Sequence, residues 1–91
     1  MEFEWDTNKA AANLQKHGIS FTEAATVFGD LLSVTFPNPN HSINESRFIT
    51  IGLSNTGKII ILSHTDRGSR IRIISARKAT RKEQRFYEEG Y

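Results

Sequence analysis

Three strand-like segments joined by short turns constrain this fold more than any other feature of the sequence. Each segment is dense in isoleucine and other residues that favour extended backbone, and each connection contains a glycine. Because connections this short join antiparallel neighbours, the segments predict an antiparallel meander. The apolar run Ile59–Leu62 indicates that the middle segment is the central strand, covered on both faces over part of its length. The segments are "RFITIGL" at 47–53, "KIIILSHT" at 58–65 and "RIRIISA" at 70–76, separated by "NTG" at 55–57 and "DRGS" at 66–69.

Helical patterns precede these strands. Phe3 and Trp5 alternate with acidic residues, which indicates a short half-buried strand. Asp6 can then cap a helix from about 7 to 17, and Gly18 can end that helix in a left-handed conformation. The N-terminal region therefore predicts a strand followed directly by a helix.

A second helix is predicted to begin at Ser20, which forms an S-x-x-E capping box with Glu23. Its apolar residues fall at helical spacing, and Gly29 closes it. From Leu31 the stretch "LLSVTF" predicts a strand that Pro37 stops. The helical apolar positions are Phe21, Ala24, Ala25 and Phe28.

The chain is predicted to finish in a helix from about Lys78 to Glu89. The resulting order is β-α-α-β-β-β-β-α, without repeats or linkers. This order predicts a small α+β fold over residues 1–91, a single domain in which helices pack on an antiparallel sheet.

Composition excludes several classes of site. The chain of 91 residues has no cysteine, so disulfides, thiolate zinc sites and a cysteine nucleophile are excluded. The histidines His17, His41 and His64 show no metal-binding spacing, so neither a metal nor another cofactor is expected. No apolar run approaches the roughly 20 residues that cross a bilayer, and the acidic N-terminus does not resemble a signal peptide, so we expect a cytoplasmic protein.

Charge is divided unevenly along the chain. Up to Gly57 there are three basic and six acidic residues, and after it nine basic and four acidic ones, so the two parts carry −3 and +5. Between Arg67 and Arg85 there are eight cations and one acid, Glu83. Such a field predicts binding of nucleic acid or of an acidic partner, although a merely solvated charged surface is the alternative.

The predicted elements give this basic stretch a geometry. Alternation places Arg70 and Arg72 on the strand face opposite Ile71 and Ile73, which belong to the core. Helical spacing predicts that the cations of the last helix share one arc, opposite its aromatic residues. These helix cations are Arg77, Lys78, Arg81, Lys82 and Arg85.

Side chains for acid–base chemistry are present without a fixed arrangement. RNA cleavage without a metal requires a base near the 2′-hydroxyl, cations for the charge on the phosphorus, and an acid for the leaving oxygen. His64 at a predicted strand end could be acid or base, and an ordinary polar residue is the alternative. Glu45 could be a base or could only pair with Arg47. Lys9 and the neighbouring cations Lys16 and His17 lie on the first predicted helix, where they are surface residues unless the fold brings them near the strand arginines.

Three segments of the chain resemble the BrnT toxins of type II toxin-antitoxin systems, which are small ribonucleases with a RelE-like fold. The segments lie in the family's order and cover about two thirds of the chain. They are "FEWDTNKAAANLQKHGISFTEAATVF" at 3–28, "ESRFITIG" at 45–52 and "HTDRGSRIRIISARKATRKEQRFYEEG" at 64–90.

The resemblance implies metal-independent RNA cleavage, inhibition of translation, and neutralisation by a BrnA antitoxin. It further implies that the ribbon-helix-helix region of the antitoxin binds operator DNA, and that toxin and antitoxin form a heterotetramer. The family's polar motif positions in this sequence are Lys9, Lys16, His17, Glu45, Arg47, Arg67, Arg72, Arg77 and Tyr87.

These observations lead to a ribonuclease hypothesis in which Arg72 and Arg77 stabilise the charge on the phosphorus while Glu45 and His64 transfer protons. The alternative is a non-catalytic module that binds nucleic acid or an acidic partner. The residues predicted to hold RNA are Arg47, Arg67, Arg70, Lys78, Arg81, Arg85, Lys9, Lys16 and His17.

Overall fold

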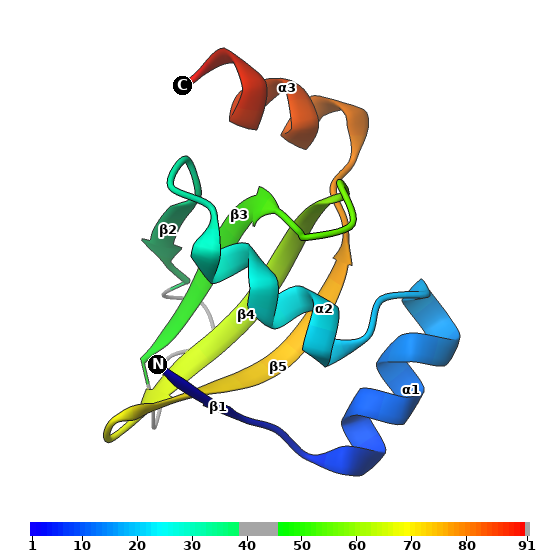
Figure 1. Ribbon diagram of the computed structural model, residues 1–91, viewed down its shortest axis with the longest axis vertical. Coiled ribbons are helices and arrows are strands. Elements are labelled where there is room, and N and C mark those ends of the chain that lie inside the picture. Colours follow the sequence, from blue (N-terminus) through cyan, green and yellow to red (C-terminus); the bar gives the residue numbers. More distant parts are fainter. Residues whose placement is uncertain (39–45, 91) are drawn as a thin grey trace.

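A five-stranded sheet runs through the centre of the molecule in the computed structural model, which describes residues 1–38 and 46–90 (Figure 1). The strand order is β1-β5-β4-β3-β2. The central position of β4 confirms the prediction from its apolar run. The strands are β1 (Glu2–Glu4), β2 (Val34–Pro37), β3 (Arg47–Leu53), β4 (Ile59–Arg67) and β5 (Arg70–Lys78); the helices are α1 (Thr7–His17), α2 (Phe21–Ala25), the 3₁₀ helix η1 (Thr26–Gly29) and α3 (Arg81–Glu89).

The meander of β3, β4 and β5 is antiparallel, as predicted, and β2 extends it antiparallel to β3. The strand β1 differs, because it joins β5 in parallel, with Phe3 opposite Ile71. The sheet is therefore mixed. A three-residue strand carries no local signal for a partner that lies almost seventy residues away, so the sequence predicts β1 but not its pairing.

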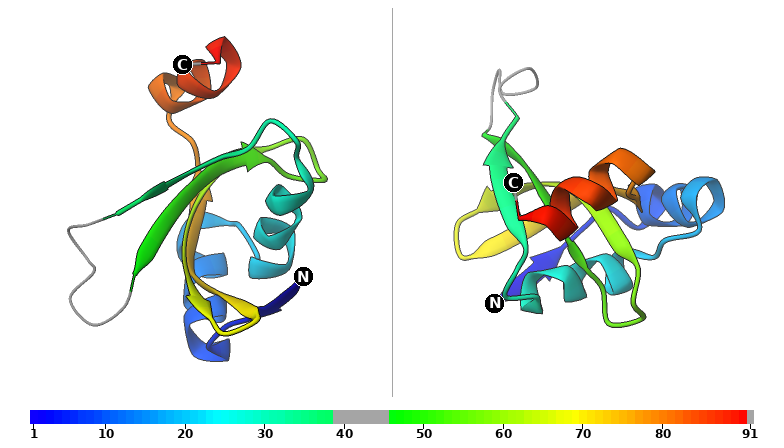
Figure 2. Two further views of the ribbon diagram at one scale, coloured as in Figure 1. Left: turned by 90° about the vertical axis from the view of Figure 1, so that its left-hand side faces the viewer. Right: turned by 90° about the horizontal axis from the view of Figure 1, so that it is seen from above.

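One face of the sheet is covered by α2 and η1, while α1 lies along the part of the β5 edge that β1 leaves uncovered (Figure 2). Burial of apolar side chains between these helices and the sheet is the main stabilising contribution. The fully packed cluster consists of Ile19, Phe21, Ala24 and Val27 from the helical layer and of Ile60, Leu62, Ile73 and Ala76 from the sheet.

The first helix has the predicted ends. The carboxylate of Asp6 accepts a hydrogen bond from the Lys9 amide at 3.0 Å, and Gly18 ends the helix with φ of 72°. The second helix is shorter than predicted, since α2 passes into η1 after Ala25. Only half of its predicted capping box forms, because Ser20 caps the Glu23 amide while the Glu23 carboxylate turns to other partners, the hydroxyls of Ser54 and Thr56.

The predicted boundary between the last strand and the last helix was wrong. β5 continues to Lys78, and α3 begins only at Arg81. Thr80 is its N-cap and forms a complete capping box with Glu83, which fixes the start of the helix after the strand. Arg77 and Lys78 are therefore strand residues and do not share the helical arc of the other cations.

The start of β2 and the regularity of β5 also differ from prediction. Leu31 and Leu32 lie in an exposed turn, and β2 begins at Val34. In β5 a bulge leaves Ile74 without a partner in β4, because Ser63 pairs with Ser75 while the next residue, His64, pairs with Ile73. The bulge shifts the alternation of faces along β5.

Among the residues described, no helix is long and apolar enough to span a membrane.

Candidate functional site

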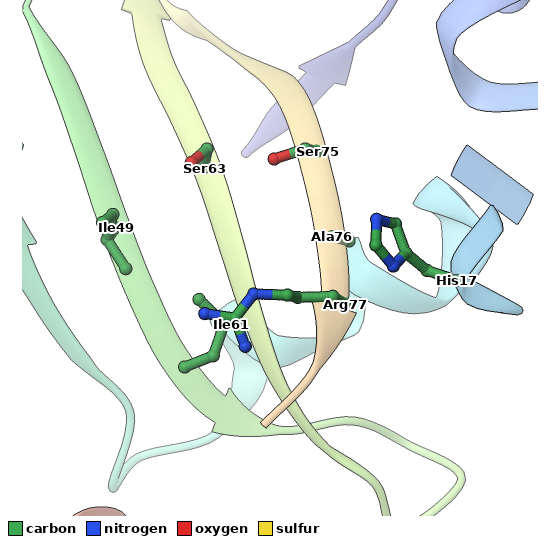
Figure 3. A pocket seen from close by; sticks show the side chains of 7 residues that line it. All are labelled: His17, Ile49, Ile61, Ser63, Ser75, Ala76 and Arg77. Carbon is green, nitrogen blue, oxygen red and sulfur yellow. The ribbon is translucent and has the colours of Figure 1, made fainter. Parts of the chain in front are cut away.

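The sheet face opposite α2 and η1 carries a cavity of about 260 Å³, which we call the open-face pocket (Figure 3). Its side chains come from three adjacent strands and from the end of α1. The pocket is lined by His17, Ile49, Ile61, Ser63, Ser75, Ala76 and Arg77.

Strand register explains how these residues meet. Ile49, Ser63 and Ser75 are successive neighbours across β3, β4 and β5, and Ile61 lies opposite Arg77 in the next row. Alternate residues of a strand share a face, so the bulge at Ile74 is what places both Ser75 and Arg77 on the open side. The pocket thus combines an apolar floor with two hydroxyls and a guanidinium.

Arg77 is held in place by the first turn of α3. Its Nη1 and Nη2 atoms donate to the two carboxylate oxygens of Glu83 at 2.8 and 2.9 Å. This bidentate pair lowers the pKa of Glu83 to about 2 and raises that of Arg77, so both groups are charged at neutral pH. A guanidinium carries five N–H donors, and this pairing leaves some of them for a phosphate.

His17 reaches the same pocket from the end of α1. The helix is fixed against β5 by Asn13, whose amide donates to the Ala76 carbonyl at 2.8 Å and accepts from the Ala76 amide at 3.1 Å. Figure 3 shows His17 on one side of β5, while Arg77 extends over β4 toward Ile61. The fold therefore places a residue of the first helix and a strand arginine in the lining of one pocket, a question that the sequence left open.

Arg70 and Arg72 lie on β5, where β1 supplies them with carboxylates. Arg70 Nε contacts Glu2 Oε1 at 3.2 Å, and Arg72 Nη1 contacts Glu4 Oε2 at 3.1 Å. Arg72 precedes Arg77 by five residues, a separation of roughly 15 Å along an extended strand. The expectation that these two arginines act on one phosphorus stays a prediction, and β1 offsets part of the positive field predicted from the chain order.

His64 lies on the helix-covered side of the sheet, apart from the open-face pocket. Its ring is 4% exposed and packs between Phe28 and Phe48, at centroid distances of 5.0 and 5.9 Å. Nε2 is 2.7 Å from the hydroxyl of Thr50, and burial lowers the pKa of the imidazole below its ordinary value of 6.5. This placement does not support His64 as the catalytic acid, because its ring is enclosed and does not reach the arginines.

The other predicted residues are distributed over several surfaces. Arg47 lies on β3 two residues before Ile49 and thus on the open side, whereas Arg67 lies at the β4 end of the β4–β5 turn. Lys78 lines a different cavity with Lys58. Arg81 and Arg85 are exposed on α3, Lys9 and Lys16 line a groove beside α1, and Glu45 lies outside the described residues. In the ranges 1–38 and 46–90, no three histidine or carboxylate side chains converge as metal ligands.

Three polar residues of the site were missed by sequence reasoning. Ser63 and Ser75 stand out only once the strand register is known. Glu83 was recognised as the single acid among many cations, but its pairing with Arg77 was not. The motif T-x-x-E at Thr80–Glu83 could have revealed the helix start and, with it, the position of Glu83 beside the strand end.

Comparison with known proteins points to one family of toxins. Residues 5–83 match a family model described as the ribonuclease toxin BrnT of type II toxin-antitoxin systems. The fold is similar to the crystal structure of the Brucella abortus ribonuclease toxin BrnT, with a TM-score of 0.70 and 28% identity over 89% of this chain and 99% of the other. No functionally curated protein matches the chain.

Proposed function

Because the chain belongs to the BrnT family of ribonuclease toxins of type II toxin-antitoxin systems, we propose that it cleaves RNA without a metal at the open-face pocket. The observation that carries this proposal is that His17 and Arg77 line one cavity, with Ser75 also in its wall. An imidazole transfers protons, a guanidinium stabilises phosphate charge, and hydroxyls position the oxygens of the substrate. These are the groups that phosphodiester cleavage requires.

In the proposed reaction a phosphate of RNA lies over Ser75. A base removes the proton of the adjacent 2′-hydroxyl, the 2′-oxygen attacks phosphorus, and the bond from phosphorus to the 5′-oxygen breaks. Arg77 stabilises the additional negative charge, and the imidazolium of His17 donates a proton to the leaving oxygen. Glu45 remains our candidate base from the sequence. The products carry a 2′,3′-cyclic phosphate and a 5′-hydroxyl.

The other basic residues are assigned to RNA binding. Cations contribute most of the affinity for a phosphate backbone, and arginine adds bidentate geometry. We assign the guanidinium of Arg72 to this set rather than to the reacting phosphorus, since it is paired with Glu4 and does not line the open-face pocket. This set comprises Arg47, Arg67, Arg70, Arg72, Lys78, Arg81 and Arg85.

The test is cleavage of RNA by purified protein in EDTA, with products analysed for cyclic phosphate ends. We expect cleavage by the wild type and a loss of about 10²–10³ in kcat for Arg77→Ala or His17→Ala, the usual cost of removing one charge-stabilising or proton-transferring group. Lys82→Gln is the matched control, because this exposed cation lies on α3 and lines none of the cavities described above. Cleavage that requires a divalent cation, or that survives both substitutions, contradicts the proposal.

The non-catalytic alternative has a distinct signature in the same experiment. A module that only binds nucleic acid retains RNA with a steep dependence on salt and cuts none of it. That outcome would replace the ribonuclease assignment for this chain.

We further propose that a BrnA-type antitoxin neutralises this protein in the cytoplasm, and that RNA cleavage there inhibits translation. Membership in a toxin-antitoxin family supports an antitoxin partner. The expected complex is a heterotetramer that contacts operator DNA only through the ribbon-helix-helix region of the antitoxin. Expression should arrest growth, co-expression of the adjacent small gene should restore it, and a rescue without complex formation would exclude direct neutralisation.

A further inference from the structure

A second cavity of about 240 Å³ lies beside the open-face pocket, between α1 and β5, and we call it the α1–β5 groove. It shares His17 and Ser75 with the open-face pocket, so the two hollows adjoin at these residues. α1 lies alongside β5 in Figure 1. The groove is lined by Lys9, Ala12, Asn13, Lys16, His17, Ile74 and Ser75.

The walls and floor of the groove differ in chemistry. Lys9 and Lys16 line it from exposed positions on α1, and within residues 1–38 and 46–90 neither ammonium lies within ion-pair distance of a carboxylate. Ala12 and Ile74 supply apolar surface between the cations and the strand. Ile74 is the bulge residue of β5 that has no partner in β4, so an irregularity of the strand is what presents this side chain there.

The groove is also held rigidly. Asn13 is 8% exposed, and its amide donates to the carbonyls of Ile19 and Ala76 at 3.0 and 2.8 Å. These bonds, together with the bond from the Ala76 amide, fix the spacing between α1 and β5. A preformed groove costs little conformational entropy when a ligand enters it.

We propose that the α1–β5 groove binds the nucleotides of single-stranded RNA next to the cleaved bond. This inference rests on the proposed ribonuclease function and extends it to a substrate subsite. Lys9 and Lys16 are seven residues apart, about 10 Å along the helix, so they contact successive phosphates rather than one. Ala12 and Ile74 contact the face of a base. Single-stranded RNA is selected because only an unpaired nucleotide offers a base face and a phosphate to one narrow groove.

The experiment uses chimeric oligonucleotides that contain one ribonucleotide among deoxynucleotides, so that cleavage occurs at a single known bond. Deoxynucleotides are added stepwise on the 5′ side or on the 3′ side. For the wild type, we expect kcat/KM to rise about tenfold as one of the two sides is extended by two nucleotides. In Lys9→Gln/Lys16→Gln that rise should be lost.

Two more variants separate the contacts. For Lys9→Gln/Lys16→Gln, the slope of log KM against log salt should fall by about 1.4, because each single-strand phosphate contact contributes about 0.7. Ile74→Ser should raise KM several-fold and leave the salt slope unchanged, because it removes base contact without removing charge. Lys82→Gln is the control for loss of a lysine outside the groove, and thermal unfolding verifies that each variant is folded.

The outcomes distinguish the subsite from the function on which it rests. A wild type that cuts no RNA in EDTA overturns the proposed function. A wild type that cuts, but whose gain from a longer substrate survives in Lys9→Gln/Lys16→Gln, overturns the groove alone. Equal salt slopes for this variant and Lys82→Gln overturn it as well.

Discussion

The carboxylate of Glu83 bonds both to the guanidinium of Arg77 and to the backbone at the start of α3. One oxygen accepts the Thr80 amide at 2.8 Å and completes the capping box of α3, while both oxygens bind the guanidinium of Arg77. The orientation of a guanidinium at the proposed reaction site therefore depends on the first turn of a helix. We infer that Glu83 is a positioning residue for Arg77 rather than a catalytic one.

Replacing Glu83 tests this role. Glu83→Gln should lower kcat about tenfold with little change in KM, because a misplaced guanidinium stabilises the transition state poorly while RNA is still held elsewhere. In an Arg77→Ala background the same substitution should have no further effect on kcat. Additive losses in the double variant would show that Glu83 acts independently of Arg77. The glutamine oxygen can still accept the Thr80 amide, so the capping box should be retained, and denaturant unfolding verifies that the variant is stably folded.

His64 predicts a pH dependence of stability. Its Nδ1 atom is buried without a hydrogen-bond partner among the residues that the structure describes, and burial lowers the pKa of the ring in the folded protein. The unfolded chain then binds a proton more readily than the folded one. The contribution of the neutral, buried His64 ring to the free energy of unfolding is therefore complete above the ordinary pKa of 6.5. It is lost as pH falls through the lower pKa of the folded state.

The measurement is the free energy of unfolding between pH 7.5 and about pH 5, for the wild type and for His64→Gln. A glutamine can keep the hydrogen bond to Thr50 but does not titrate. The wild type should lose stability toward acid more steeply than His64→Gln. Parallel curves for the two proteins would mean that His64 is not the responsible group.

At the scale of elements, local signals predicted the strands and α1 well. The isoleucine-rich segment "RFITIGL" predicted both ends of β3 correctly. Asp6 and Gly18 predicted the start and the end of α1. Features that depend on contacts between distant segments could not be predicted from these local signals. The parallel docking of β1 on β5, the bulge at Ile74 and the end of β5 depend on contacts between distant segments, and these three features determine which arginines reach the open-face pocket.

Gly52 is another residue whose structural role could not be predicted from the local sequence. It is buried in β3, and a Cβ atom placed there would lie 2.7 Å from Val27 Cγ1 of η1. The close approach of η1 to β3 therefore requires a glycine. In the sequence, however, this position is an ordinary member of the strand pattern "RFITIGL". A single glycine within a strand signals a close contact, but it does not identify the segment that makes the contact.

At the scale of the whole molecule, the fold redistributes the charge that the chain order suggested. The division into −3 and +5 treats the two parts as separate, yet β1 places Glu2 and Glu4 beside Arg70 and Arg72. The surface with unpaired positive charge is thus narrower than the eight cations between Arg67 and Arg85 would suggest. Arg77, Lys9 and Lys16 line the pocket and the groove, so the RNA-binding surface that we propose lies around β5 and α1.

This arrangement predicts that the carboxylates of β1 restrain RNA binding. Glu2→Gln/Glu4→Gln raises the net charge from +2 to +4 and releases Arg70 and Arg72. Affinity for single-stranded RNA should rise several-fold at low salt, and the slope of log affinity against log salt should steepen by about 0.7 for each arginine that gains a phosphate. The constant kcat should not change, because neither carboxylate lies in the open-face pocket.

The matched control is Glu88→Gln/Glu89→Gln, which makes the same change in net charge at exposed positions near the end of α3. Net charge alone would raise the affinity of both variants equally, since a long-range field does not depend on which carboxylate is removed. Local release of Arg70 and Arg72 predicts the larger gain for the β1 variant and a steeper salt slope in that variant only. Filter binding across a salt series separates the effect of net charge from the release of these arginines. Equal slopes for the two variants would show that Arg70 and Arg72 do not contact RNA even when Glu2 and Glu4 are neutralised.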